Sequence, residues 1–422
     1  MRCGCAEPVA GRGTPSRRYD AAVADPGDAL LDALTLVAPG TPLRQGLDRV
    51  LQGKRGALVV IGDSPAVLAI CTGGFDLHAN FTPQRLSELA KMDGAIVLTF
   101  DASRIVRANV HLMPRASIPT SETGTRHRTA ERVARSLDVP VVTVSEAMST
   151  ITVYRGGARH TLQQPARLID RATQAIAAAE RFKSRFDLAL ALLSTLEVED
   201  TVSVSDVVAV LQPGEMVVRF VDEIEGYLVE LGEDGRFIRL QIEELGAGIE
   251  ETLRLVALDY VALPAGAPPA GAGVDLPYGN GARPGRGTRP GRDGRPGRDG
   301  GHDEHVAVLR ACADAALAGL HDLTHEELLG RTAVAAALGF EPDPGVLDMA
   351  VEARGYRLLH RLPRVSEAII ERIVERFVTL PRLMQASLAD LEKVGGVGEA
   401  KARSVKDGLS RMVEASILER YE

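Results

Sequence analysis

A cationic cluster lies within Thr123–Thr129, which reads Thr-Gly-Thr-Arg-His-Arg-Thr. The apolar residues that follow are spaced i, i+3, i+4 and i+7, and this spacing predicts a helix with one apolar stripe: Ala130, Val133, Ala134 and Leu137. The cations therefore fall in the first turn, where free N–H groups and the positive end of the helix dipole already favour anions. Guanidinium groups add planar, bidentate contacts to phosphate oxygens. The stretch predicts a polyphosphate site.

Two explanations exist for the placement of Arg126, His127 and Arg128 at a helix start, where positive charge is unfavourable. A structural explanation requires neighbouring carboxylates, and Glu122 and Glu131 could supply them. Phosphate binding explains the placement better, because the ligand itself then supplies the negative charge.

An Asp-Gly pair, Asp93 and Gly94, precedes a predicted strand at Ala95–Thr99. Taken alone, such a pair is typical of an ordinary turn. Beside a phosphate-binding helix it gains a chemical role, because nucleotidyl transfer needs a divalent cation and a carboxylate to hold it. Gly94 would let the backbone come close to the ligand.

Several other kinds of catalytic site are not supported by the sequence. It contains no P-loop motif, no kinase motif set, no His-Glu-x-x-His and no nucleophile elbow. His78 and His111 lie among apolar residues and are interpreted as packed or surface histidines.

The elements that must position these residues alternate between strand and helix from about residue 28 to 155. Thr82 and Pro83 are typical of a helix N-cap and first turn, with Phe81 and Leu86 spaced as a hydrophobic staple. The alternation predicts an α/β domain with a mixed sheet. Its predicted strands are Ala57–Ile61, Val67–Ile70, Ala95–Thr99, Arg104–Val110, Val141–Val144 and Ile151–Tyr154.

The rest of the chain is predicted to be mostly helical. Apolar periodicity covers Arg167–Leu196, Val204–Leu211 and Pro213–Leu231, which is typical of a packing or spacer domain. Residues 264–303 repeat Arg-Pro-Gly-Arg and predict a disordered insertion. Its arginines could contact nucleic acid, although we favour a solvated tether. Residues 304–422 return to helical patterning.

A second motif lies near the end of the chain, at Gly396-Val397-Gly398. Apolar residues on both sides predict two helices joined by a tight turn, which resembles a helix-hairpin-helix. Backbone N–H groups of such a turn can bind a DNA phosphate, and Lys393, Lys401, Arg403 and Lys406 surround it. A packing hairpin without a ligand is the alternative. Residues 362–365, before Ile369 and Ile373, resemble a degenerate first copy.

Amino-acid composition limits which partners the protein is expected to bind and in which cellular compartment it is expected to occur. The net charge is −8, so a nucleic-acid surface must be local, and residues 354–422 carry a modest excess of +3 (13 Lys and Arg against 10 Asp and Glu). Four scattered cysteines, including Cys3 and Cys5, predict a reduced, cytoplasmic setting. No apolar run reaches the length of about 18 residues typical of a membrane span, and no signal core is present.

Together, four segments resemble the DNA integrity scanning family of bacterial diadenylate cyclases: Phe81–Pro83, Lys91–Ala95, Ala108–Leu112 and Ile118–Glu131. The resemblance covers nearly the whole chain outside the leader and the insertion. It implies that two ATP molecules condense to cyclic di-AMP and two diphosphates. It also implies a homo-octamer associated with the nucleoid, and lower cyclase output when branched DNA such as a Holliday junction is bound.

The resemblance also implies residue roles. Asp93 would hold Mg²⁺ or Mn²⁺ and help to activate the 3′ hydroxyl, with Arg128 as the second catalytic residue. The implied ATP-binding set is Gly94, Ala95, Leu112, Thr125, Arg126, His127, Arg128, Thr129 and Ser145. The implied DNA-binding set is Gly396, Val397, Gly398, Lys401 and Arg403.

We therefore expect a flexible leader at 1–27, a cyclase domain at 28–160, a helical spine at 161–350 and an all-α helix-hairpin-helix domain at 351–422. The competing hypothesis is a DNA-binding scaffold whose nucleotide site senses ATP without catalysis. Release of diphosphate distinguishes the two.

Overall fold

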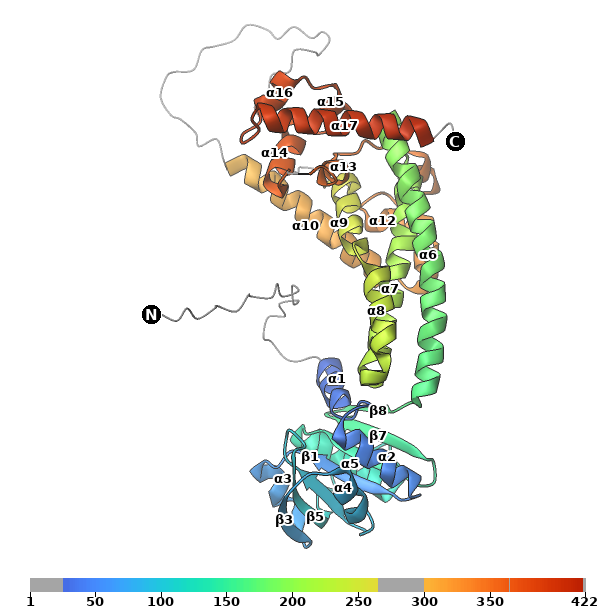
Figure 1. Cartoon of the computed structure of the whole chain (residues 1–422), viewed down its shortest axis with the longest axis vertical. Helices are drawn as coiled ribbons and strands as arrows, with labels where there is room; N and C mark the ends of the chain where they lie inside the picture. Colours follow the sequence, from blue (N-terminus) through green and yellow to red (C-terminus); the bar gives the residue numbers. More distant parts are fainter. Residues whose placement is uncertain (1–25, 265–299, 364, 420–422) are drawn as a thin grey trace, which may run out of the picture. The chain divides into compact units, whose positions relative to one another are not determined.

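The computed structural model describes residues 26–264, 300–363 and 365–419 (Figure 1). The chain forms two compact units. The first extends to Ile169 and also includes Tyr227–Arg236, whereas the second comprises Asp170–Gly226 and the chain from Phe237 onward. The first unit thus contains a segment that is remote in sequence.

The first unit is an α/β domain with a mixed sheet, as predicted. The strand order is β2-β5-β4-β1-β6-β7-β8, and β3 also pairs with β5. Strands β1 and β4 are parallel, and the other pairs are antiparallel. The strands are β1 Ala57–Ile61, β2 Cys71–Thr72, β3 Phe75–Asn80, β4 Ala95–Leu98, β5 Arg104–Leu112, β6 Val141–Ser145, β7 Thr150–Arg155 and β8 Ala158–Thr161.

Helices cover both faces of this sheet, because successive strand residues point to opposite faces. Val59 and Ile96 join a core with α1, α2 and α4, whereas Val60 and Val97 join a second core with α3 and α5. The result is a three-layer arrangement. The helices are α1 Pro26–Leu36, α2 Pro42–Gln52, α3 Pro65–Ala69, α4 Pro83–Leu89 and α5 Thr125–Leu137.

One predicted strand, Val67–Ile70, is wrong, because most of it lies in helix α3. The side chain of Ser64 accepts a hydrogen bond from the Val67 N–H, and Pro65 occupies the first turn, so local capping favours a helix. The expected cap of α4 is confirmed, since Thr82 accepts from the Arg85 N–H at 3.1 Å. Strands β2, β3 and β8 were not predicted.

The remote segment of the first unit is the end of helix α7 (Val204–Leu231) and the short helix η1 (Gly232–Gly235). Glu230 is buried, and its carboxylate accepts hydrogen bonds from the Gln163 N–H and, at 2.7 Å, from His160 Nε2. A Cβ at Gly232, whose φ is +52°, would lie 2.5 Å from the Pro39 carbonyl oxygen. The segment is therefore packed and hydrogen-bonded into the unit.

The second unit is helical. Helix α7 continues through Pro213, where the sequence suggested two separate segments. Its elements, apart from α7, are α6 Pro165–Glu199, α8 Arg236–Gly246, α9 Ile249–Tyr260, α10 Gly300–Asp322, α11 His325–Leu329, α12 Arg331–Ala337, η2 Pro344–Asp348, α13 Tyr356–His360, α14 Glu367–Phe377, α15 Leu380–Gln385, α16 Leu388–Glu392 and α17 Glu399–Glu419.

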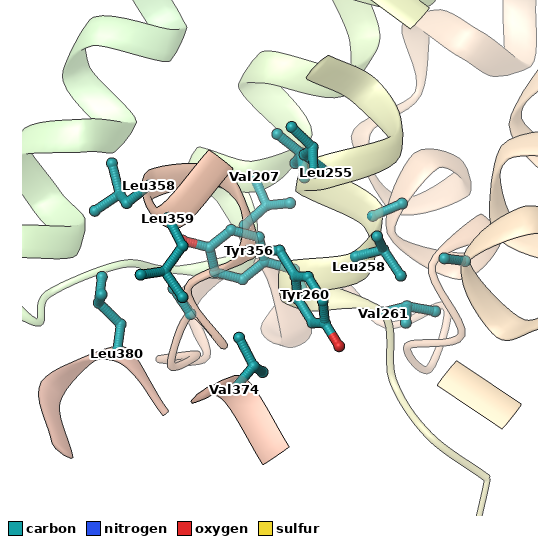
Figure 2. Packing of buried hydrophobic residues seen from close by; sticks show 14 of the residues in the cluster. Val207, Leu255, Leu258, Tyr260, Val261, Tyr356, Leu358, Leu359, Val374 and Leu380 are labelled. Carbon is teal, nitrogen blue, oxygen red and sulfur yellow. The ribbon is translucent and has the colours of Figure 1, made fainter. Parts of the chain in front are cut away.

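A single core joins the spine helices to the C-terminal helices (Figure 2). Tyr356 of α13 lies in the same cluster as Val207 of α7 and Leu255 of α9. The buried carboxylate of Asp259 accepts the N–H groups of three successive residues at the start of α13, at 2.6–3.0 Å. The guanidinium of Arg354 in turn donates to three carbonyl oxygens at the end of α9. Each helix end is thus capped by the other segment.

Two predicted flexible segments fall mainly outside the described residues. Within the leader, Pro26 and Gly27 already belong to α1. Within the insertion, the structure describes residue 264 and residues 300–303, and the latter begin α10. Cys3 and Cys5 also lie outside the described residues. Among the described helices, none is long and apolar enough to cross a membrane.

Candidate functional site

Four strands bring the predicted residues to one edge of the sheet. The start of β4 at Ala95 lies opposite Val110 of β5, and the start of β1 at Ala57 lies opposite Val144 of β6. Since β1 and β4 are parallel, both starts lie at the same edge. Residues expected to bind nucleotide therefore gather there from separate strands: Asp93, Gly94, Ala95, Leu112 and Ser145.

The Asp-Gly motif and the cationic helix start meet in an ion pair, although Asp93 and Arg126 are 33 residues apart in sequence. Arg126 Nη2 lies 2.7 Å from Asp93 Oδ1. The Asp93 side chain is 94% exposed and that of Arg126 is 44% exposed, so both groups are open to a ligand. Gly56 makes room for the guanidinium, because a Cβ there would lie 2.3 Å from Arg126 Nη1.

Gly94 allows a close backbone contact with strand β5. A Cβ at Gly94 would lie 2.4 Å from the carbonyl carbon of Asn109 and 2.5 Å from its Cα. Asn109 itself has φ of +56°, a region that asparagine tolerates better than most residues. Close approach of β4 to β5 therefore fixes the backbone next to Asp93.

The predicted helix is α5, which begins at Thr125 after Gly124 as N-cap. Arg128 in its first turn is exposed, and its guanidinium has no hydrogen-bond or ion-pair partner among the residues that the structure describes. The Thr129 hydroxyl donates to the Thr125 carbonyl at 2.9 Å. The helix start thus presents a free cation beside the paired Arg126.

His127 differs from the flanking arginines because it is partly buried and held from behind. Its Nδ1 lies 2.8 Å from the Tyr154 hydroxyl and 3.2 Å from the Thr143 hydroxyl. Tyr154 donates to Glu122 Oε1 at 3.0 Å, and Arg159 donates to the same oxygen at 2.5 Å. Burial opposes ionisation of Glu122, but these two hydrogen bonds outweigh it and lower the pKa of its carboxyl.

The carboxylates offered as a structural explanation for the cations are engaged elsewhere. Glu122 binds Arg159 and Tyr154, as described above. Glu131 accepts from the Thr120 hydroxyl at 2.5 Å and from the Ser121 N–H at 3.1 Å, and it pairs with Arg135. Within the described chain, neither carboxylate has a hydrogen bond or ion pair with Arg126 or Arg128.

The donor set at this edge fits a metal ion that arrives with a nucleotide. Among the described residues, no group of three or more His, Cys, Asp or Glu side chains could hold an ion alone. Asp93 offers a single exposed carboxylate. Mg²⁺ commonly binds through one or two carboxylates together with substrate phosphates and water, so this arrangement suits it.

The predicted C-terminal hairpin is present between α16 and α17. Gly396 has φ of +84°, and Leu391, Val394 and Val397 are buried, so the turn is tight and anchored. Lys401 Nζ donates to the Gly396 carbonyl oxygen at 3.2 Å.

The other cations around the hairpin also have protein partners. Lys393 pairs with Asp390, and Arg403 with Glu399, but both cations are exposed. Lys406 instead donates to the carbonyl oxygens of Met384 and Ala386. In the upstream copy, Leu362, Ile369 and Ile373 are buried, and Arg364 lies outside the described residues.

Four residues of the site were not selected from the sequence. Gly56 and Arg159 belong to no recognised motif, and Thr143 and Tyr154 look like ordinary members of apolar strands. Only the register of β6 with β7, which places Thr143 two positions from the partner of Tyr154, could have indicated that they flank one side chain.

Two family models match this chain. Residues 44–159 match the model described as DisA bacterial checkpoint controller nucleotide-binding, and residues 162–270 match the DisA bacterial checkpoint controller linker region.

Curated relatives match almost the whole chain, and each is named DNA integrity scanning protein DisA. One from Frankia alni is 45% identical over 94% of this chain and 99% of its own length. One from Streptomyces coelicolor is 47% identical over 93% and 95%, respectively. A third, from Acidothermus cellulolyticus, is 46% identical over 93% and 96%. The chain therefore belongs to the DNA integrity scanning protein (DisA) family, and it is a diadenylate cyclase.

Proposed function

We propose that the chain condenses two ATP molecules into cyclic di-AMP and two diphosphates, and that branched DNA regulates this reaction. The observation that carries the proposal is the Asp93–Arg126 ion pair, because it joins a metal-binding carboxylate to a phosphate-binding helix start. In each of two equivalent steps, a 3′ oxygen bonds to the α-phosphorus of the other ATP. The bond from that phosphorus to the β-phosphate bridging oxygen breaks, diphosphate leaves, and the hydroxyl proton is released.

The residues at the edge act mainly by positioning and by charge. An ion of Mg²⁺ or Mn²⁺, when bound, would neutralise phosphate oxygens and make the attacking hydroxyl more acidic. Asp93 would hold that ion and orient the hydroxyl. Arg126 and Arg128, together with the N–H groups at the start of α5, would bind the triphosphate and the departing diphosphate.

Contacts with the substrate and its metal ion can replace the Asp93–Arg126 ion pair. Exposed ion pairs contribute only about 0–1 kcal/mol, so a triphosphate and its metal ion can separate Arg126 from Asp93 at little cost. Arg126 would then turn to a phosphate while Asp93 turns to the metal. In the absence of nucleotide, the pair keeps both side chains at the same edge of the sheet.

A second active site must face the first, because the attacking hydroxyl belongs to the other ATP. We infer that two cyclase units meet face to face within a homo-octamer. A lone subunit should then bind ATP without forming product.

The hairpin at Gly396–Gly398 is our candidate DNA contact. Exposed Lys393, Lys401 and Arg403 surround its turn, and their contacts would be with phosphates, which carry no sequence information. Binding should therefore depend on DNA shape, as at a Holliday junction, and should weaken as salt rises. This activity would place the protein at the nucleoid.

One assay separates catalysis from the alternative of an ATP-sensing scaffold. The full chain, incubated with ATP and Mg²⁺ or Mn²⁺, should release diphosphate and form cyclic di-AMP. Binding of ATP without diphosphate release would support the scaffold instead. Asp93→Asn should abolish product, and full activity in that variant would exclude its metal role.

A further inference from the structure

Behind His127 lies a chain of hydrogen bonds that the proposed reaction does not by itself require. It runs from His127 Nδ1 to Tyr154, from Tyr154 to Glu122, and from Glu122 to Arg159. Tyr154 is 1% exposed and the Glu122 side chain is 14% exposed, so these two are shielded from water, whereas the Arg159 side chain at the outer end is 60% exposed. Its members come from α5, β7, the segment before α5, and β8.

The direction of these hydrogen bonds follows from the chemistry of the groups. An ionised carboxylate has only acceptors, so the Tyr154 hydroxyl must direct its proton to Glu122. The phenol oxygen is then left as an acceptor for His127. Tyr154 is the nearer of the two hydroxyls at Nδ1, at 2.8 Å against 3.2 Å for Thr143, so we assign a proton to Nδ1, and Nε2 is the nitrogen left for a ligand. Among the described residues, Nε2 has no hydrogen-bond partner.

We propose that Tyr154 and Glu122 are positioning residues, which hold His127 with Nδ1 protonated so that Nε2 meets a substrate phosphate. The inference rests on the proposed function for the role of that phosphate. At many metal and catalytic sites, the hydrogen bond made by one ring nitrogen of a histidine determines which of the two nitrogens is left for the ligand. With Nδ1 already protonated, a second proton on Nε2 makes the ring a cationic donor.

The first test is spectroscopic and needs no catalysis. Nitrogen-15 NMR of histidine-labelled full-length protein distinguishes a protonated ring nitrogen from an unprotonated one. The chain has nine histidines, and the signal lost in His127→Gln identifies the right one. We expect neutral His127 to carry its proton on Nδ1. In Tyr154→Phe the nearer acceptor, at 2.8 Å, is gone and only the Thr143 hydroxyl at 3.2 Å remains, so part of the population should move its proton to Nε2.

Two further variants make this test decisive. Glu122→Gln keeps the shape of the side chain but replaces a group that only accepts with an amide that can also donate, so the Tyr154 hydroxyl is free to donate to Nδ1 and the Nδ1-protonated population of His127 should fall. This variant also serves if Tyr154→Phe does not fold. Tyr356→Phe is the matched control, because Tyr356 is a buried tyrosine of the second unit, and it should leave the His127 signals unchanged.

Kinetics then tests the role towards the substrate. Hydrogen bonds that involve a charged group typically contribute enough for roughly a 10-fold effect or more on a rate or affinity. We expect Tyr154→Phe and Glu122→Gln to reduce kcat/KM for ATP by roughly 10-fold. Tyr356→Phe should match the parent.

The outcomes separate this inference from the proposed function. An Nδ1-protonated population that is the same in parent, Tyr154→Phe and Glu122→Gln would overturn the positioning role, whatever the cyclase rate. The expected NMR changes without diphosphate release from the parent protein would support the positioning of His127 and count against the proposed reaction alone.

Discussion

Substitution of Gly94 by alanine should disrupt both the fold and the candidate site. The added Cβ would lie 2.4 and 2.5 Å from two backbone atoms of Asn109, and backbone cannot rotate away as a flexible side chain can. Overpacking of this kind destabilises proteins by about 1–3 kcal/mol, and contact with backbone places Gly94→Ala near about 3 kcal/mol. For a unit of 150–250 residues, that is a fall in Tm of roughly 6–12 °C.

The assay pairs thermal unfolding with diphosphate release. Because Gly94 adjoins Asp93, separating β4 from β5 should also displace the carboxylate, so activity should fall even at temperatures where the variant is folded. Gly157→Ala is the matched control in the same unit, since nothing lies within 4 Å of its added Cβ. If Gly94→Ala unfolded at the temperature of Gly157→Ala and kept full activity, the claimed strand contact would be wrong.

Three other substitutions give contrasting expectations. Asp93→Asn should abolish diphosphate release, which the release assay measures. It should change the free energy of unfolding, measured by calorimetry, by no more than about 1 kcal/mol, because it removes only an exposed ion pair. Gly396→Val should weaken Holliday-junction binding in a gel-shift titration and spare basal synthesis, because φ of +84° at this position is strained for any residue with a Cβ. Gly395→Ala is the control and should bind normally, because nothing lies within 4 Å of its added Cβ. Burial and nearby Glu197 raise the pKa of Asp259 to about 7. A carboxyl whose pKa is raised on folding from 3.8 to about 7 stabilises the protein fully below about pH 4 and loses that contribution as pH rises from there through about 7, so the Tm of the parent should fall between about pH 4 and 7 more than that of Asp259→Asn.

Local patterns were sufficient to predict most of the central sheet. Strands β1, β4 and β6 are runs of β-branched and apolar residues, the cap of α4 follows from Thr82, and helix α5 follows from the apolar spacing after Thr125. Strand β3 escaped prediction because most of its residues are exposed, so no alternation of buried and exposed positions marks it.

The site could be predicted only in part, because its motifs are short and its supports are remote in sequence. The cationic helix start and Asp93 are recognisable by residue type. Their ion pair, the space at Gly56 and the hydrogen bond from Tyr154 depend on strand register, which the sequence does not display. The wrong strand prediction at Val67–Ile70 has a local cause instead, because the Ser64 cap favours a helix although the segment is apolar.

The buried carboxylate of Glu230 has a consequence for the order in which the chain folds during synthesis. Its hydrogen bonds to His160 and Gln163 can form only after α6 and most of α7 have been translated. A nascent or truncated chain that ends at Ile169 therefore holds every strand of the sheet but lacks the segment that completes the unit. The first unit therefore gains these contacts only after translation of the helix that also builds the spine.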